Sequence, residues 1–290
     1  MKISQRLKLK DMSLKHILQE IEKLDEIEYS RPDPRRALLR HLGTFTKKAM
    51  FTALPFGLLT TTNRVSAQTV SVGVIEPVLQ LALIIKRMQA EFYTLGINAS
   101  ALVPAGIDLD ALTTIKNQET QHVRFLDEAL KALGKVPAAT PSFDFTGGKG
   151  VGTGPFANVF TNYDTFLTLA QILEDTGVRA LKGQIPELLG AGSVITNFLN
   201  LHSVEARHAS HVRRMRMARG VNVKPWITGK DSAIGANAQL SYDGEETTTQ
   251  AGIDIIDING QSVSSSAASE SFDEPLTKEQ ALIILDPFIV

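Results

Sequence analysis

Two short stretches decide the predicted fold, Gln118-Glu119-Thr120-Gln121-His122 and Val204-Glu205-Ala206-Arg207-His208. Each places a glutamate three residues before a histidine, a spacing that puts both side chains on one face of a helix. In both stretches this face is also the apolar stripe, because hydrophobic residues recur around it at steps of three and four. A buried carboxylate is costly unless it has a partner. Such a pair on a buried stripe therefore indicates a metal ligand set.

The same periodicity predicts an all-α fold, a four-helix bundle over residues 68–220. Apolar residues recur at helical spacing over 73–96, 108–133, 157–184 and 190–219. Pro104-Ala105-Gly106 separates the first two helices, and Pro186 and Gly190 separate the last two. Residues 137–155 are too rich in glycine and proline for a helix. This connection is long enough to cross the length of the bundle, which favours an overhand crossover over a tight hairpin.

Each predicted helix carries a glutamate on its stripe, and two helices add a histidine. The six candidate metal ligands are Glu91, Glu119, His122, Glu174, Glu205 and His208. Four carboxylates bring about four negative charges, which two divalent cations neutralise while imidazoles complete the coordination. Residue 105, inside the predicted turn, lies midway between Glu91 and Glu119. The midpoint between Glu174 and Glu205 lies beside Gly190. Both hairpins would therefore hold their ligands at one height.

These residues resemble the ferritin-like superfamily of di-iron and di-manganese carboxylate proteins, most closely the type that includes desiccation-related proteins. The resemblance covers 68–220 and rests on residues 90–93, 118–122, 173–175 and 204–208. It implies a centre of two iron ions, with two manganese ions as the alternative. Glu91, Glu119 and His122 would serve one ion and Glu174, Glu205 and His208 the other, with Glu119 and Glu205 as bridges. Residues 224–226 and 272–277 are also similar to the tail of that family.

Composition narrows the alternatives. The chain has no cysteine, which excludes disulfides, thiolate catalysis and the Cys-rich iron module of rubrerythrins. A formal net charge of −1 gives no electrostatic argument for nucleic-acid binding. No apolar run reaches the ~18–20 residues of a membrane-spanning helix. The 70 residues after the last predicted helix argue against the storage shell of cage-forming ferritins.

The two ends of the chain have different compositions. Residues 1–67 form a predicted leader with Arg35-Arg36, an apolar stretch over 49–59 and Val65-Ser66-Ala67, similar to a twin-arginine export signal. We therefore expect export to the periplasm or cell envelope, with a cytoplasmic protein as the alternative if this segment packs on the bundle. Residues 221–290 form a predicted irregular acidic tail. It ends in a short docking helix, marked by a capping box of Thr277 and Gln280.

Neighbouring residues receive more ordinary interpretations. Asp175 and Glu128 are assigned to solvated helix faces, and Tyr93 to packing away from the ligands. Arg213 and Arg216 are assigned to a basic helix end that complements the helix dipole.

Two functions are consistent with this sequence, and whether the protein is an enzyme stays open. The first is a ferroxidase- or oxidase-like dinuclear centre, redox-active toward oxygen or peroxide, with manganese catalase-like peroxide disproportionation as a variant. The second is a stress or desiccation-related envelope protein that binds metal without turnover. The expected partners are metal ions and oxygen or peroxide, and a homo-oligomer remains open.

Overall fold

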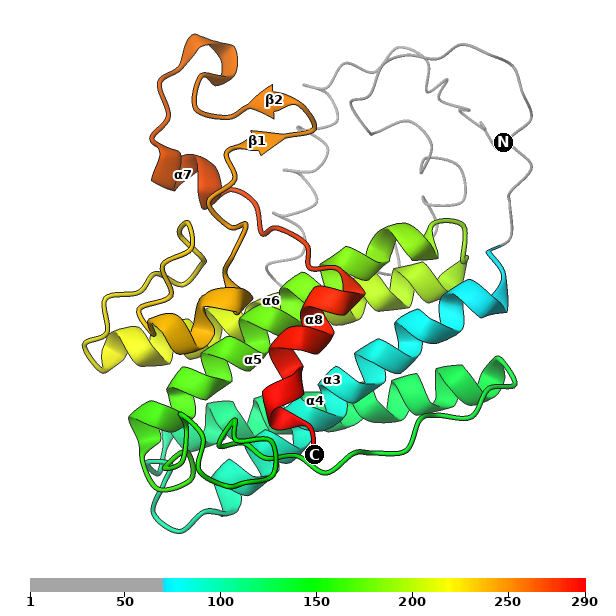
Figure 1. Ribbon diagram of the computed structural model, residues 1–290, viewed down its shortest axis with the longest axis vertical. Coiled ribbons are helices and arrows are strands. Elements are labelled where there is room, and N and C mark those ends of the chain that lie inside the picture. The colour runs from blue at the N-terminus through cyan, green and yellow to red at the C-terminus, as the bar shows by residue number, and fades with distance from the viewer. Residues whose placement is uncertain (1–69) are drawn as a thin grey trace, which may run out of the picture. The chain divides into compact units, whose positions relative to one another are not determined.

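The computed structural model describes residues 70–290, and four long helices dominate it (Figure 1). They are α3 (Val72–Asn98), α4 (Ile107–Ala132), α5 (Tyr163–Gln184) and α6 (Ser193–Ala218). The four-helix prediction is confirmed, with one boundary corrected. The third helix begins at Tyr163 and not near 157, because the side chain of Asn162 accepts a hydrogen bond from the backbone of Thr165 and caps the helix there. The predicted leader, residues 1–67, lies outside the described residues.

The long connection between α4 and α5 sets the directions of the helices. Figure 1 shows residues 133–162 running along the bundle before α5 begins. Consequently α5 starts at the end where α4 starts, and the Tyr163 hydroxyl donates to Asp108 Oδ2 at 3.0 Å. The ring of Phe166 meanwhile packs against Gly96, near the end of α3. The two hairpins, α3–α4 and α5–α6, are thus joined by the crossover that the sequence predicts.

The core consists of two apolar clusters with a polar layer between them. One cluster includes Met88, Phe92 and Leu112, and the other includes Leu83, Leu126 and Phe198. The helix positions between these clusters carry charged and amide side chains. A polar layer inside a close-packed bundle is expensive unless its groups satisfy one another. The fold therefore concentrates its buried charge at one level of the bundle.

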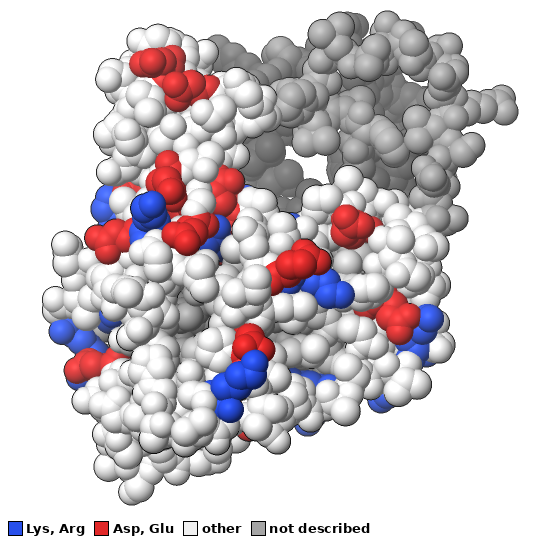
Figure 2. All heavy atoms as spheres, in the orientation of Figure 1, with Lys and Arg blue, Asp and Glu red and all other residues white. Residues whose placement is uncertain are grey.

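The tail after α6 contains only short elements. They are η2 (Ala236–Ser241), β1 (Thr249–Gln250), β2 (Ile253–Asp254), η3 (Ile258–Gly260), α7 (Ser265–Ser269), α8 (Lys278–Leu285) and η4 (Asp286–Phe288), while η1 (Ile185–Leu188) separates α5 from α6. The two strands pair antiparallel. Figure 2 shows acidic side chains gathered over this part of the surface. The predicted capping box of Thr277 and Gln280 is confirmed at the start of α8.

One buried ion pair and a buried hydrogen bond attach the tail to the bundle, next to an ion pair between α5 and α6. Arg213 of α6 contacts both carboxylate oxygens of Asp175, and the Tyr242 hydroxyl donates to Asp175 Oδ2 at 2.6 Å. Arg179 of α5 pairs with Glu245 at 2.6 Å. The solvated-face interpretation of Asp175 was therefore wrong, as was the helix-dipole interpretation of Arg213. Both side chains are covered by tail residues whose place the local pattern could not reveal.

No helix among the described residues has the length and hydrophobicity needed to cross a membrane.

Candidate metal centre

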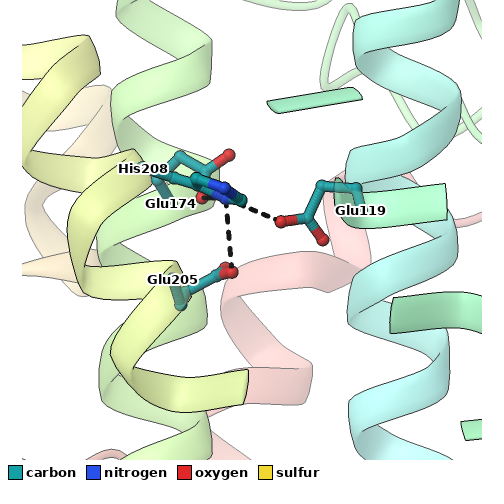
Figure 3. Close-up of side chains that lie close together, drawn as sticks. All are labelled: Glu119, Glu174, Glu205 and His208. Carbon is teal, nitrogen blue, oxygen red and sulfur yellow. Dashed lines mark ion pairs between the residues drawn. The ribbon is translucent and has the colours of Figure 1, made fainter. Parts of the chain in front are cut away.

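Three helices bring four potential ligands together in the polar layer. Glu119 comes from α4, Glu174 from α5, and Glu205 and His208 from α6 (Figure 3). One donor atom from each lies within 4.8 Å of the others, and all four side chains are buried. Such convergence of carboxylates and an imidazole is the donor chemistry that iron and manganese take in proteins. These residues form the carboxylate cluster of the protein.

Glu119 is the residue of the carboxylate cluster that most lacks hydrogen bonds. Its Oε1 lies 2.8 Å from Nδ1 of His208 as an ion pair, and its Oε2 lies 3.1 Å from Nζ of Lys86. Neither oxygen, nor Nδ1 of His208, has a hydrogen bond of acceptable geometry to a described residue. Buried oxygens and an imidazole nitrogen left in this condition are suited to coordinate a cation. The residues present therefore fit a bound metal ion.

A neighbouring amide determines which nitrogen of His208 faces the cluster. Nε2 of His208 lies 2.6 Å from Oε1 of Gln118, an oxygen that can only accept a hydrogen bond. Nε2 therefore carries a proton, and Nδ1 is the atom turned toward Glu119 and Glu174. An imidazole oriented in this way by its second nitrogen is the usual state of a metal-ligating histidine.

The sequence predicts that the first helix contributes Glu91 to this layer, but α3 contributes other side chains. Lys86, Gln89 and Tyr93 face the carboxylate cluster, and all three are buried. Nζ of Lys86 pairs with Glu205 as well as Glu119 and donates to Oε1 of Gln89 at 3.0 Å. The Gln89 amide donates to both Glu174 and Glu205. The Tyr93 hydroxyl donates to Oε1 of Glu174 at 2.6 Å, so its interpretation as packing away from the ligands was wrong.

Glu91 is the predicted ligand that the structure does not bring into the carboxylate cluster. It lies half-buried on α3, and burial raises the pKa of its carboxyl above the usual value. Positions 79, 82, 86, 89, 93 and 96 form the fully buried stripe of α3. Residue 91 lies off this stripe, as does Leu95, which is 42% exposed. The expected levelling of Glu91 with Glu119 placed the centre of the turn at residue 105. In the structure α3 ends at Asn98 and α4 begins at Ile107, so Lys86 and Glu119 each lie 12 residues from the turn, whereas Glu91 lies only 7 residues from it.

His122 lies beside the carboxylate cluster and not within the group of four. Its Nδ1 is 3.5 Å from Oε2 of Glu119, and its ring centre is 6.2 Å from that of His208. A surface hollow of about 230 Å³, lined by His122, Phe125 and Leu201 among others, borders it between α4 and α6. His122 therefore stands between Glu119 and the surface of the described part of the chain.

Opposing electrostatic effects act on the cluster. Burial alone would raise the pKa of Glu119, yet Lys86 and the two nearby imidazoles hold it well below the usual range. Burial, together with the neighbouring carboxylates, raises the pKa of Glu205 well above its usual value despite Lys86. Burial would lower the pKa of His208, but contacts with Glu119 and Glu174 raise it to about 10. For Lys86 burial again lowers the pKa, and the carboxylates reverse the effect. The cluster thus attracts positive charge strongly.

Space for the cluster depends on one glycine of α5. A Cβ atom placed on Gly177 would lie 2.1 Å from Oε1 of Glu205 and 3.0 Å from Nε2 of Gln89. Any larger residue at this position would push the Glu205 carboxylate out of its place. Gly177, which lies three residues after Glu174 on α5, therefore leaves room for the carboxylate of Glu205.

Sequence reasoning missed Lys86, Gln89 and Gly177, although one signal was available. The steps from 79 to 96 alternate three and four, and Lys86 and Gln89 interrupt this stripe in the same way that the glutamates interrupt the others. Residues 78–85 are hydrophobic on nearly every face apart from Gln80. Hydrophobicity alone therefore could not show which stripe of α3 faces the centre of the bundle. The glutamate at 91 favoured the stripe that contains it, and this is not the stripe that faces the carboxylate cluster.

Comparison with known proteins agrees with the architecture. The family model described as ferritin-like domain matches residues 76–218, which span most of α3 and all of α4, α5 and α6. No curated protein matches this chain. The matched region contains the crossover bundle and all four residues of the carboxylate cluster. By this match and this architecture, the chain belongs to the ferritin-like domain family.

Proposed function

We propose that this protein binds iron, or manganese as the alternative, at the carboxylate cluster of its ferritin-like bundle. The observation that carries the proposal is the convergence of Glu119, Glu174, Glu205 and His208 within 4.8 Å in a buried layer. The single positive charge of Lys86 cannot balance three carboxylates, which would repel one another in a medium of low polarity without a further cation. Carboxylate oxygens with an imidazole are donors that iron and manganese take in proteins.

The surrounding side chains keep the ligands in place. Tyr93 and Gln89 donate to Glu174, and Gln89 also donates to Glu205, so both carboxylates are held by α3. Gln118 orients the ring of His208. The apolar clusters above and below keep water away from this layer. These contacts fix the orientation of the side chains that would coordinate an ion.

The chemistry that we propose for the bound metal is redox reaction with oxygen or peroxide. Iron or manganese supplies the electrons for such reactions, while the protein supplies orientation and a water-poor site. The Tyr93 hydroxyl keeps its proton, since burial and Glu174 raise its pKa well above the usual value. It therefore remains a hydrogen-bond donor to Glu174 throughout.

A specific observation favours the alternative, a metal-binding protein without turnover. Lys86 already neutralises part of the carboxylate cluster by its ion pairs with Glu119 and Glu205. Because part of the negative charge is already neutralised, a second redox-active ion is not required to balance it.

Two assays on metal-loaded protein distinguish these functions. Oxygen uptake with ferrous iron identifies an oxidase, peroxide disproportionation identifies a catalase, and neither activity is expected of a protein that binds metal without turnover.

Metal binding itself is tested with one carboxylate-to-amide pair on α4. Glu119→Gln removes a buried ligand and keeps its volume, whereas Glu128→Gln changes a carboxylate that is 73% exposed. We expect elemental analysis after anaerobic loading with Fe²⁺ or Mn²⁺ to find metal in the wild-type chain and in Glu128→Gln. Glu119→Gln should lose it. Equal metal content in all three proteins would refute the assignment of the site.

Export of the protein stays a separate proposal that rests on Arg35-Arg36 and on the small residues at 65–67. Mass spectrometry of the mature N-terminus tests it. A chain that begins at Gln68 supports export, and one that begins at Met1 contradicts it.

A further inference from the structure

Lys86 is the buried cation that the proposed function leaves unexplained. Its side chain is 0% exposed and sits at the midpoint of the buried stripe of α3. Taking an ammonium group out of water costs several kcal/mol unless close negative charge compensates for it. A lysine here therefore points to a role for its charge.

The position of this ammonium group is that of a bridging cation. Nζ of Lys86 contacts Oε2 of Glu119 at 3.1 Å and also pairs with Oε2 of Glu205. These glutamates belong to α4 and α6, one from each hairpin of the bundle. They are also the two residues that the family resemblance assigns as metal bridges. The ammonium group thus joins the same two carboxylates that a second metal ion would join.

The two oxygens of Glu119 divide the polar layer into two sides. Oε1 is directed toward His208, at 2.8 Å from its Nδ1, in the group with Glu174 and Glu205. Oε2 is directed toward Lys86, and Nδ1 of His122 lies 3.5 Å from the same oxygen. The first side therefore offers the donors for a metal ion. It shares Glu205 with the second side, because Oε2 of Glu205 pairs with Lys86 and lies 3.9 Å from Nδ1 of His208. The other side holds an ammonium group where an ion coordinated by His122 would need to be.

The charges of the layer agree with one divalent ion. Glu119, Glu174 and Glu205 carry three negative charges when ionised, and the Lys86 ammonium offsets one of them. One divalent cation balances the two that remain. The fourth carboxylate of the predicted dinuclear set, Glu91, is not in the group and so cannot balance a second ion.

We propose that the ammonium group of Lys86 takes the place of one of two metal ions, so that the centre binds a single divalent ion per chain. This inference rests on the proposed metal binding and specifies its stoichiometry. Glu119, Glu174, Glu205 and His208 hold the ion, and Lys86 keeps the second position closed. Replacing Lys86 by glutamate removes the competing cation and adds the missing carboxylate on the correct helix.

The test is anaerobic titration of the full chain with Mn²⁺, followed by elemental analysis and electron paramagnetic resonance. We expect one ion per wild-type chain, with the hyperfine pattern of an isolated Mn²⁺. Lys86→Glu should bind two ions and show an exchange-coupled pair. Arg87→Gln is the matched control, because Arg87 pairs with Asp127 outside the cluster. It should bind one ion, like the wild type.

The outcomes separate this inference from the proposed function. Two ions in the wild-type chain would overturn the inference and leave metal binding intact. One ion in a folded Lys86→Glu variant would also overturn it. No ion in the wild-type chain would overturn both. Because Lys86→Glu could fail to fold without metal, it is produced and purified with Mn²⁺ present, and Lys86→Met serves as a second variant. Lys86→Met removes the ammonium and adds no ligand, so it should bind its ion more tightly than the wild type, because Glu119 and Glu205 lose the competing cation. Equal Mn²⁺ affinity in the two proteins would overturn the inference.

Discussion

The buried pair of Asp175 on α5 and Arg213 on α6 offers the sharpest test of how burial strengthens a charge pair in this protein. Both side chains are 2% exposed, and Arg213 donates to both carboxylate oxygens at 2.5–3.0 Å. Tyr242 donates to the same carboxylate from the tail. Asp175→Asn keeps the shape of the side chain and removes its charge. The guanidinium is then left buried opposite a neutral group.

The expected cost follows from that burial. Removing one partner of a buried ion pair destabilises a protein by about 3–5 kcal/mol, because the remaining charge has lost its compensation. For a described domain of this size, about 1 kcal/mol lowers Tm by roughly 2–4 °C. We therefore expect Asp175→Asn to lower Tm by on the order of 10 °C.

The matched control is Glu128→Gln, the same chemical change at an exposed pair. Glu128 and Lys131 are 73% and 57% exposed, and such pairs contribute about 0–1 kcal/mol. Chemical denaturation followed by circular dichroism measures both variants against the wild type. If Asp175→Asn and Glu128→Gln cost the same within about 0.5 kcal/mol, the argument that burial amplifies this pair is wrong.

Three further predictions concern glycines and one buried acid. Gly183→Ala places a Cβ 1.8 Å from the backbone carbonyl oxygen of Leu276, so it should destabilise the protein by about 1–3 kcal/mol. In the control Gly73→Ala, the new Cβ meets nothing closer than 3.8 Å, so this variant should be as stable as the wild type or more stable. Thermal denaturation compares the two variants. Gly177→Ala should displace the Glu205 carboxylate and weaken metal binding about 10- to 100-fold, measured by isothermal titration; unchanged affinity would show that Glu205 is not a ligand. Burial raises the pKa of the Glu245 carboxyl from 4.5 to about 7. Between these two pH values the folded chain holds a proton that the unfolded chain has released. The free energy of unfolding should therefore fall by about 3 kcal/mol as the pH rises from 4.5 through 7. Urea denaturation across that range should show this slope in the wild type and not in Glu245→Gln, where Arg179 keeps its backbone acceptors.

Helical periodicity was sufficient for the bundle and for most of the carboxylate cluster. Hydrophobic residues recur at steps of three and four along α4, α5 and α6, and the glutamates at 119, 174 and 205 and His208 fall within these series, so they could be assigned to the buried side. Turn residues marked the hairpins, and glycine content marked the crossover. These features are local, because they depend on spacing within one helix or one loop.

The error at Glu91 shows where local reasoning ends. On α3 the residues around Lys86 are apolar on several faces, so the sequence offers more than one stripe of helical spacing. Only packing against both α4 and α5 selects the stripe that contains Lys86, Gln89 and Tyr93. The same limit applies to Asp175 and Arg213, which resemble surface charges until Tyr242 and the tail cover them.

The chain by itself therefore determined an all-α crossover bundle, a buried layer of acids and imidazoles, and a capped helix near its end, because each depends on residue spacing along one element. Tertiary structure alone decided that α3 contributes an ammonium group in place of a carboxylate, and that the tail contacts the buried Arg179 and Arg213. The physical reason is that a charge is stabilised by the charges that surround it in space, and those neighbours come from helices and loops far apart in the sequence.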